Sequence, residues 1–182
     1  MGEINRALRL DPISPIVNTN VGLRLAEAGR VEEGIEQLRK TLVMEPEFGV
    51  AHAHLGAMYV YVARYDEGIA ELQKAIELVA GNPWPKAYLG YTYGLKGDKT
   101  KAQNLIRELE EASKSEFAPN VLLGTIYFAI GEKEKAFSLI RKAYEERSYD
   151  LISLRELTLY WRIRADPRFN TILARMLPDT QN

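Results

Sequence analysis

The chain of 182 residues has no cysteine, only two histidines, and no long apolar run. Without cysteine it forms neither disulfides nor thiolate metal sites. No stretch reaches the 18 or more apolar residues of a membrane-spanning helix, and residues 1–10 lack the apolar core of a secretory signal. Its 24 basic and 25 acidic side chains leave a net charge of −1, so no overall field attracts nucleic acid or acidic lipid. We therefore expect a cytoplasmic protein that binds neither nucleic acids nor membranes.

Groups that carry catalysis are also scarce. His52 and His54 are two residues apart, so on a helix they point in different directions and cannot share a metal ion. The glycines between 90 and 97 resemble a phosphate-binding loop, but no strand precedes them. The glutamates between 108 and 111 fit a solvated helix face, and no serine has a nearby histidine. We predict a protein that is not an enzyme and that has no cofactor or metal.

The chain has instead a repeat of 34 residues. An apolar residue followed by glycine recurs at this spacing four times, at Gly22, Gly56, Gly90 and Gly124. Twelve residues after each glycine comes a small residue, at Gly34, Gly68, Ala102 and Ala136. Four residues further comes an aliphatic one, at Leu38, Leu72, Ile106 and Ile140. Each period reads as two antiparallel helices, A and B, whose small residues let the two backbones approach closely.

This order of residues resembles the tetratricopeptide repeat in period and pattern. The resemblance covers four units: 15–48, 49–82, 83–116 and 117–150. It implies an all-α fold, a right-handed α-α superhelix of antiparallel helix pairs. The chain departs from the family where a tryptophan is usual, since Asn18, His52, Lys86 and Asn120 stand there.

The turn between the two helices of a unit also follows the period. Gly29, Gly97 and Gly131 suit a left-handed helix end, whereas the second unit has Ala63 at this place. We therefore predict that the turn at Ala63 is either tighter than the others or strained. Two prolines within residues 80–85 predict a clean break between the second and third units.

The two ends of the chain differ from the units between them. Residues 1–14 are predicted to form a lone helix B of a truncated repeat, with a native capping helix as the alternative. Residues 151–178 are predicted to form a closing helix pair, in which Asp166 caps a helix that begins at Pro167. The runs 143–147 and 166–169, together with Leu173, resemble the closing segment of repeat arrays in bacterial signalling proteins. We expect one solenoid over residues 1–182 that belongs to the C-terminal part of a longer protein.

In this family the stacked helices A line a concave face. Carried over by position in the unit, with neighbouring side chains included, the predicted peptide-binding residues are Leu23, His54, Ala57, Tyr61, Trp84, Tyr88, Tyr91, Thr125, Phe128, Arg155 and Arg162. Most are apolar or aromatic, which favours an amphipathic helix or an extended apolar peptide as ligand. Packing of the chain against itself is the alternative. Arg155 and Arg162 belong to a closing segment of net charge +3, which suits an acidic partner, a phosphate or merely a solvated cap.

These features predict a protein–protein interaction scaffold that holds a peptide or helix of a partner in its groove. Two alternatives remain. The N-terminal helix, if uncovered, would make the chain an oligomerisation element through self-association. A groove that takes a small apolar molecule would make it a ligand-sensing regulatory domain of a larger signalling protein.

Overall fold

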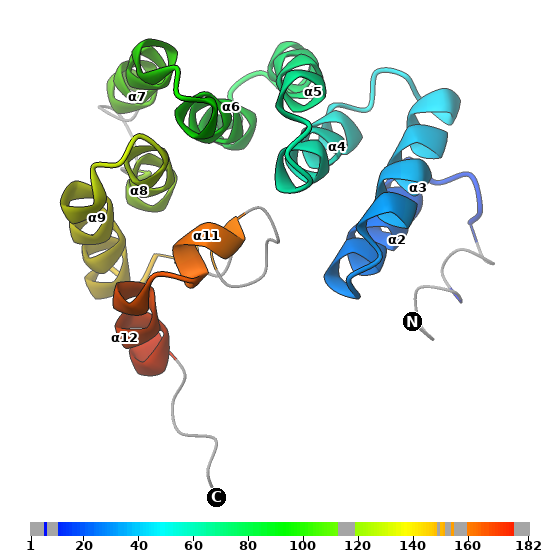
Figure 1. Ribbon diagram of the computed structural model, residues 1–182. Helices are drawn as coiled ribbons and strands as arrows, with labels where there is room; N and C mark the ends of the chain where they lie inside the picture. The colour runs from blue at the N-terminus through cyan, green and yellow to red at the C-terminus, as the bar shows by residue number, and fades with distance from the viewer. Residues whose placement is uncertain are drawn as a thin grey trace, which may run out of the picture. The chain divides into compact units, whose positions relative to one another are not determined.

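The computed structural model describes residues 6, 11–112, 119–148, 150, 151, 154 and 160–176, and within them every regular element is a helix (Figure 1). Successive helices form antiparallel hairpins, which confirms the expected all-α array of helix pairs. The helices are α2 (Pro15–Glu27), α3 (Val31–Met44), α4 (Gly49–Tyr61), α5 (Tyr65–Leu78), α6 (Pro83–Lys96), α7 (Lys99–Ala112), α8 (Asn120–Ala129), α9 (Lys133–Glu145), α11 (Trp161–Arg164) and α12 (Pro167–Met176).

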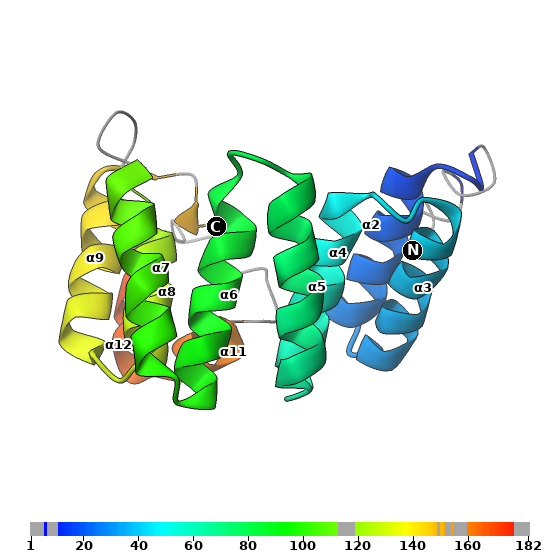
Figure 2. The same cartoon turned by 90° about the horizontal axis from the view of Figure 1, so that it is seen from above.

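The chain divides into two compact units, Met1–Leu89 and Gly90–Asn182, with the boundary inside α6. In the first unit, the hairpins α2/α3 and α4/α5 pack together because both α2 and α3 contact α4 (Figure 2). In the second unit, α8 contacts α7 and α9, and α12 contacts α9 and α11. Each of the four proposed repeats contains two successive helices, and the expected lone helix of residues 1–14 lies almost wholly outside the described residues.

The paired helices approach closely at the small residues of the repeat. A methyl group on Gly56 of α4 would lie 2.7 Å from Cγ of Leu72 and 3.0 Å from the carbonyl oxygen of Gly68, both on α5. Equivalent contacts join α2 to α3 at Gly22 and α8 to α9 at Gly124, which confirms the predicted approach. Gly90 differs, since a methyl group there would first meet Ile126 of the following hairpin, at 2.7 Å.

The turns within the hairpins also agree with the pattern. Gly29, Gly97 and Gly131 have φ angles of 80°, 88° and 90°. Ala63 holds the same conformation at φ 63°, which costs a residue with a side chain about 1–2 kcal/mol. Of the two predicted alternatives, the turn is strained, and it is not tighter, because its backbone hydrogen bonds match those of the turn at Gly29. Between the second and third repeats, α5 ends at Leu78 and α6 begins at Pro83, as the prolines predicted.

Asn18 and His52 stand at the position where the tetratricopeptide repeat usually has tryptophan. In the first two repeats these side chains form hydrogen bonds between neighbouring segments. The His52 ring nitrogens lie 2.5 Å (Nδ1) from Oε2 of Glu71 on α5 and 2.9 Å (Nε2) from the Pro46 carbonyl oxygen. This ring therefore joins the loop before α4 to both helices of its hairpin. One period earlier, the same positions hold Asn18, Gln37 and Pro12, and the Asn18 amide accepts from Gln37 at 2.7 Å and donates to the Pro12 carbonyl at 2.8 Å.

Replacing Ala63 with glycine should stabilise the protein by about 1 kcal/mol, because glycine adopts a positive φ without steric cost. For a chain of this length the melting temperature should rise by about 2–4 °C, measured by circular dichroism. Ala28→Gly is the matched control, because Ala28 precedes a turn glycine but has an ordinary φ of −77°. A gain in the control as large as in Ala63→Gly would contradict strain at Ala63.

Candidate functional site

In the first unit, part of the predicted peptide-binding stripe is accessible on the face formed by α2 and α4. Leu23, His54 and Ala57 are half-buried, and Tyr61 is 36% exposed. Ile16, at the start of α2, is 51% exposed. On each helix these residues recur at spacings of three, four or seven, so they share one side. We call Ile16, Leu23, His54, Ala57 and Tyr61 the A-face strip.

The A-face strip carries no charge at neutral pH. Burial lowers the pKa of His54 to about 4, because the imidazolium form loses hydration without gaining an acidic partner. The ring is therefore neutral at pH 7 and acts as a half-buried aromatic group. Trp84, at the start of α6, is also half-buried, and its ring meets Tyr88 edge-on at a centroid distance of 6.0 Å.

Three predicted contact residues lie in the interior instead. Tyr88 is 3% exposed, while Tyr91 and Thr125 are fully buried. Tyr91 packs edge-on against Tyr160, next to α11, with ring centroids 5.4 Å apart. Thr125 donates its hydroxyl to the Leu122 carbonyl at 2.7 Å. The expectation that these three side chains face a peptide is therefore corrected, because each of them packs in the interior.

The remaining predicted residues lie in the second unit. Phe128 is half-buried at the end of α8, where its ring meets Phe137 of α9 edge-on at 6.0 Å. Arg162 is exposed on α11, and Arg155 lies outside the described residues. A peptide-binding role for these three residues stays a prediction.

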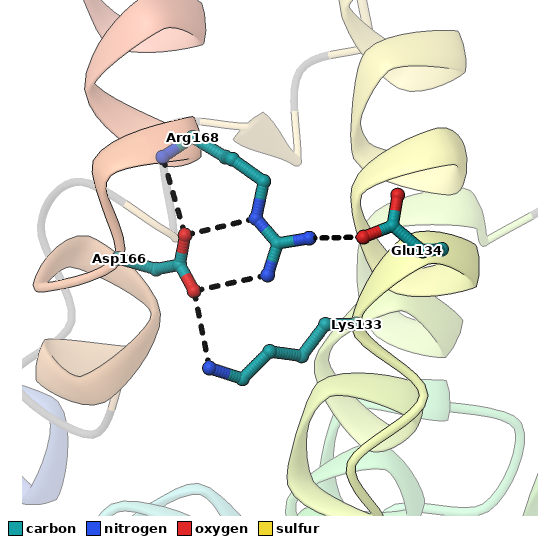
Figure 3. Close-up of polar contacts among 4 residues, drawn as sticks. All are labelled: Lys133, Glu134, Asp166 and Arg168. Carbon is teal, nitrogen blue, oxygen red and sulfur yellow. Dashed lines mark hydrogen bonds and ion pairs between the residues drawn. The ribbon is translucent and has the colours of Figure 1, made fainter.

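An ionic cluster joins α12 to the start of α9 (Figure 3). The Asp166 carboxylate, with its side chain 9% exposed, accepts the backbone N–H of Arg168 at 3.2 Å, which confirms the predicted helix cap. It also accepts Nε and Nη2 of Arg168 at 3.0 and 3.1 Å and Nζ of Lys133 at 3.3 Å. The remaining guanidinium nitrogen of Arg168 donates to Glu134 at 2.6 Å. The hydrogen bonds from Arg168 hold the pKa of Asp166 well below its ordinary value.

Beside this cluster lies a groove of about 490 Å³ between α9 and α12, which the sequence reasoning missed. Helix α9 contributes Glu134, Phe137, Ser138, Arg141 and Tyr144, and α12 contributes Arg168, Thr171 and Ile172. We call it the α9–α12 groove. The only sequence signal was the helical spacing of these residues. Whether two helices B leave a gap between them depends on their side-chain packing, which periodicity does not report.

A smaller groove of about 330 Å³ lies between α7 and the start of α9. Its walls include Arg107, Glu110, Glu132 and Lys135, so charges of both signs already face each other there. The Lys135 ammonium donates to the Tyr127 hydroxyl at 2.6 Å and lies 4.0 Å from the centroid of that ring. We call it the α7–α9 groove.

In the ranges that the structure describes, no three histidine, aspartate or glutamate side chains come together as metal ligands would. Nor is any described helix both long and apolar enough to cross a bilayer.

No family model matches the chain, and no curated protein matches its sequence. Among solved structures, it is similar to a chain of the "Crystal structure of APC/C hetero-tetramer Cut9-Hcn1", at 15% identity and a TM-score of 0.38. The match covers 96% of this chain and 45% of the other, so this chain spans less than half of that chain's length. A likeness this low carries no argument about function, and the fold described above stands on the helices themselves.

Asp166→Asn should destabilise the protein at pH 7 by about 1–3 kcal/mol, because it weakens a helix cap and charged hydrogen bonds. The folded pKa of Asp166 lies below the unfolded value of about 4, so this stability is complete above about pH 4 and is lost as pH falls toward the folded pKa. Urea unfolding of both proteins between neutral and acidic pH should show the difference shrink on acidification. The control Glu134→Gln, at a side chain 96% exposed, should cost less than about 0.5 kcal/mol. A difference between wild type and Asp166→Asn that does not change with pH would contradict this account.

Proposed function

We propose that this chain is a non-enzymatic protein–protein interaction scaffold of the tetratricopeptide-repeat type. Two features support the proposal: the repeat pattern of 34 residues and the consecutive helical hairpins that follow it. Stacked hairpins display long rows of side chains on rigid helices, and such surfaces suit the binding of extended or helical segments.

The observation that carries the proposal is the A-face strip in the first unit. Its side chains are apolar or uncharged, and those of Ile16 and Tyr61 are 51% and 36% exposed. Leu23 packs against a buried cluster that includes Leu38 and Leu55, so this part of the A-face strip is anchored to the hydrophobic core. A partner peptide would gain about 25 cal/mol for each Å² of apolar surface that it covers there.

The ligand that best fits the strip is an apolar segment, either extended or an amphipathic helix. A tyrosine at the edge of such a surface adds area at low cost in side-chain entropy, as binding hot spots do. The half-buried Trp84, one period after Val50 and two after Ile16, would extend the strip toward the start of α6.

Self-association is a second candidate function, because the first hairpin carries other exposed apolar side chains. Ile13 is 76% exposed, Val43 is 82% exposed and Met44 is 45% exposed. Because α2 and α3 are antiparallel, Ile13 before α2 and Val43 near the end of α3 fall at the same end of the hairpin. Light scattering after size-exclusion chromatography separates the candidates. A dimer that Val43→Glu dissociates would favour an oligomerisation element.

We expect a peptide selected from a random library on the whole chain to bind through the A-face strip. Ile16→Glu and Tyr61→Ala should each weaken that peptide by about tenfold, measured by fluorescence anisotropy. Val43→Glu is the matched control, since it changes an exposed apolar residue on α3, outside the strip, and should alter binding less than about twofold. Failure to select any peptide, or equal binding by the strip variants and wild type, would contradict the proposal.

A further inference from the structure

The α9–α12 groove contains a cation that the protein itself does not neutralise. The Arg141 side chain is exposed, and among the described residues it has neither an ion pair nor a hydrogen bond. Arg168, on the opposite wall, is paired with Asp166 and Glu134. The positive charge available to a ligand in this groove therefore belongs to Arg141.

Two hydroxyl groups in the groove can donate hydrogen bonds in addition to the Arg141 guanidinium. Ser138 on α9 and Thr171 on α12 line the groove, and neither hydroxyl has a hydrogen-bond partner in the part of the chain that the structure describes. A hydroxyl or a guanidinium can donate to a carboxylate, whose oxygens only accept. The polar groups left open in the groove thus match a carboxylate better than an amine.

The floor of the same groove is apolar. Phe137 is 3% exposed and Ile172 is 8% exposed, so each presents a small apolar area to the groove that it lines. The Arg168 guanidinium carbon lies 4.5 Å from the centroid of the Phe137 ring. A volume of about 490 Å³ accommodates an aliphatic side chain together with a neighbouring polar one.

We propose that the α9–α12 groove binds an acidic-aliphatic peptide segment of a protein partner. A carboxylate of the segment pairs with Arg141 and accepts from the hydroxyls, and an adjacent aliphatic side chain covers the small apolar area that Phe137 and Ile172 present to the groove. This surface lies wholly in the second unit. It is separate from the A-face strip, and its test uses different variants.

The repeat supplies an internal comparison. Arg107 of α7 lies one period before Arg141 and occupies the α7–α9 groove. There its guanidinium donates to Asn104, and Glu110 and Glu132 line the same walls. An incoming carboxylate would meet two like charges in that groove, whereas the one carboxylate among the lining residues of the α9–α12 groove, Glu134, is paired with Arg168. Arg107 is therefore a matched control that should not select acidic peptides.

The experiment uses the full chain and defined peptides followed by fluorescence anisotropy. The first probe is a capped peptide of about eight residues that alternates aspartate with leucine, about 25 Å long when extended. A second peptide has lysine in place of aspartate, and a third has serine in place of leucine. We expect the first to bind at least about tenfold more tightly than either of the others.

Among the variants, Arg141→Glu should weaken the aspartate–leucine peptide by about tenfold or more, and Arg107→Glu by less than about twofold. Arg141→Gln removes the charge without reversing it, and it replaces Arg141→Glu in the test if charge reversal disturbs folding. Amide chemical shifts of Ser138, Arg141 and Thr171 should move on titration with the peptide. The proposal is overturned if the aspartate–leucine peptide does not bind, if the lysine peptide binds as well, or if the Arg141 and Arg107 variants bind alike.

Discussion

The close approach of the two helices of a hairpin is the constraint on which the remaining structure depends. At Gly56 a single methyl group would meet Leu72 at 2.7 Å and the Gly68 carbonyl oxygen at 3.0 Å. Only small residues fit there, and Gly22 and Gly124 bring the helices of their own hairpins together in the same way. The same helix position recurs 34 residues later along the sequence. Both candidate surfaces, the A-face strip and the α9–α12 groove, are rows of such repeated positions.

Hydrogen bonds and ion pairs between polar side chains add to the helix contacts that the glycines allow. His52 ties the loop before α4 to Glu71 on α5, and Asn18 does the same one period earlier. Asp166 and Arg168 fasten the final helix to the start of α9. Each of these polar contacts fixes the relative position of two segments. Apolar packing alone fixes it less well, because hydrophobic contact has little directional preference. The last of these ties also aligns one end of the α9–α12 groove, since Glu134 and Arg168 are wall residues.

The two candidate surfaces differ in chemistry, which suits two kinds of contact. The A-face strip is uncharged, because burial keeps His54 neutral. The groove combines an apolar floor with the unpaired charge of Arg141, which has no ion pair in the described part of the chain. Apolar area supplies affinity with little selectivity, whereas a charge at the rim selects among partners and speeds their encounter. A scaffold that uses both surfaces would bind one partner by apolar contact with the A-face strip and select another by its charge at the α9–α12 groove.

Local features of this protein followed from its sequence alone: the hairpin period, the strained turn at Ala63, the break before Pro83 and the cap at Asp166. Each depends on backbone preferences or hydrogen bonds within a few residues, so the order of residues is sufficient to reveal it. The exposure of individual side chains did not follow from the sequence. Tyr91 belongs to a helix face predicted to bind peptide, yet it is buried against Tyr160, which comes from the far end of the chain. The opening between α9 and α12 likewise depends on how side chains of two separate helices meet. Such contacts are decided by tertiary packing, because burial is a property of the space around a residue and not of its neighbours in sequence.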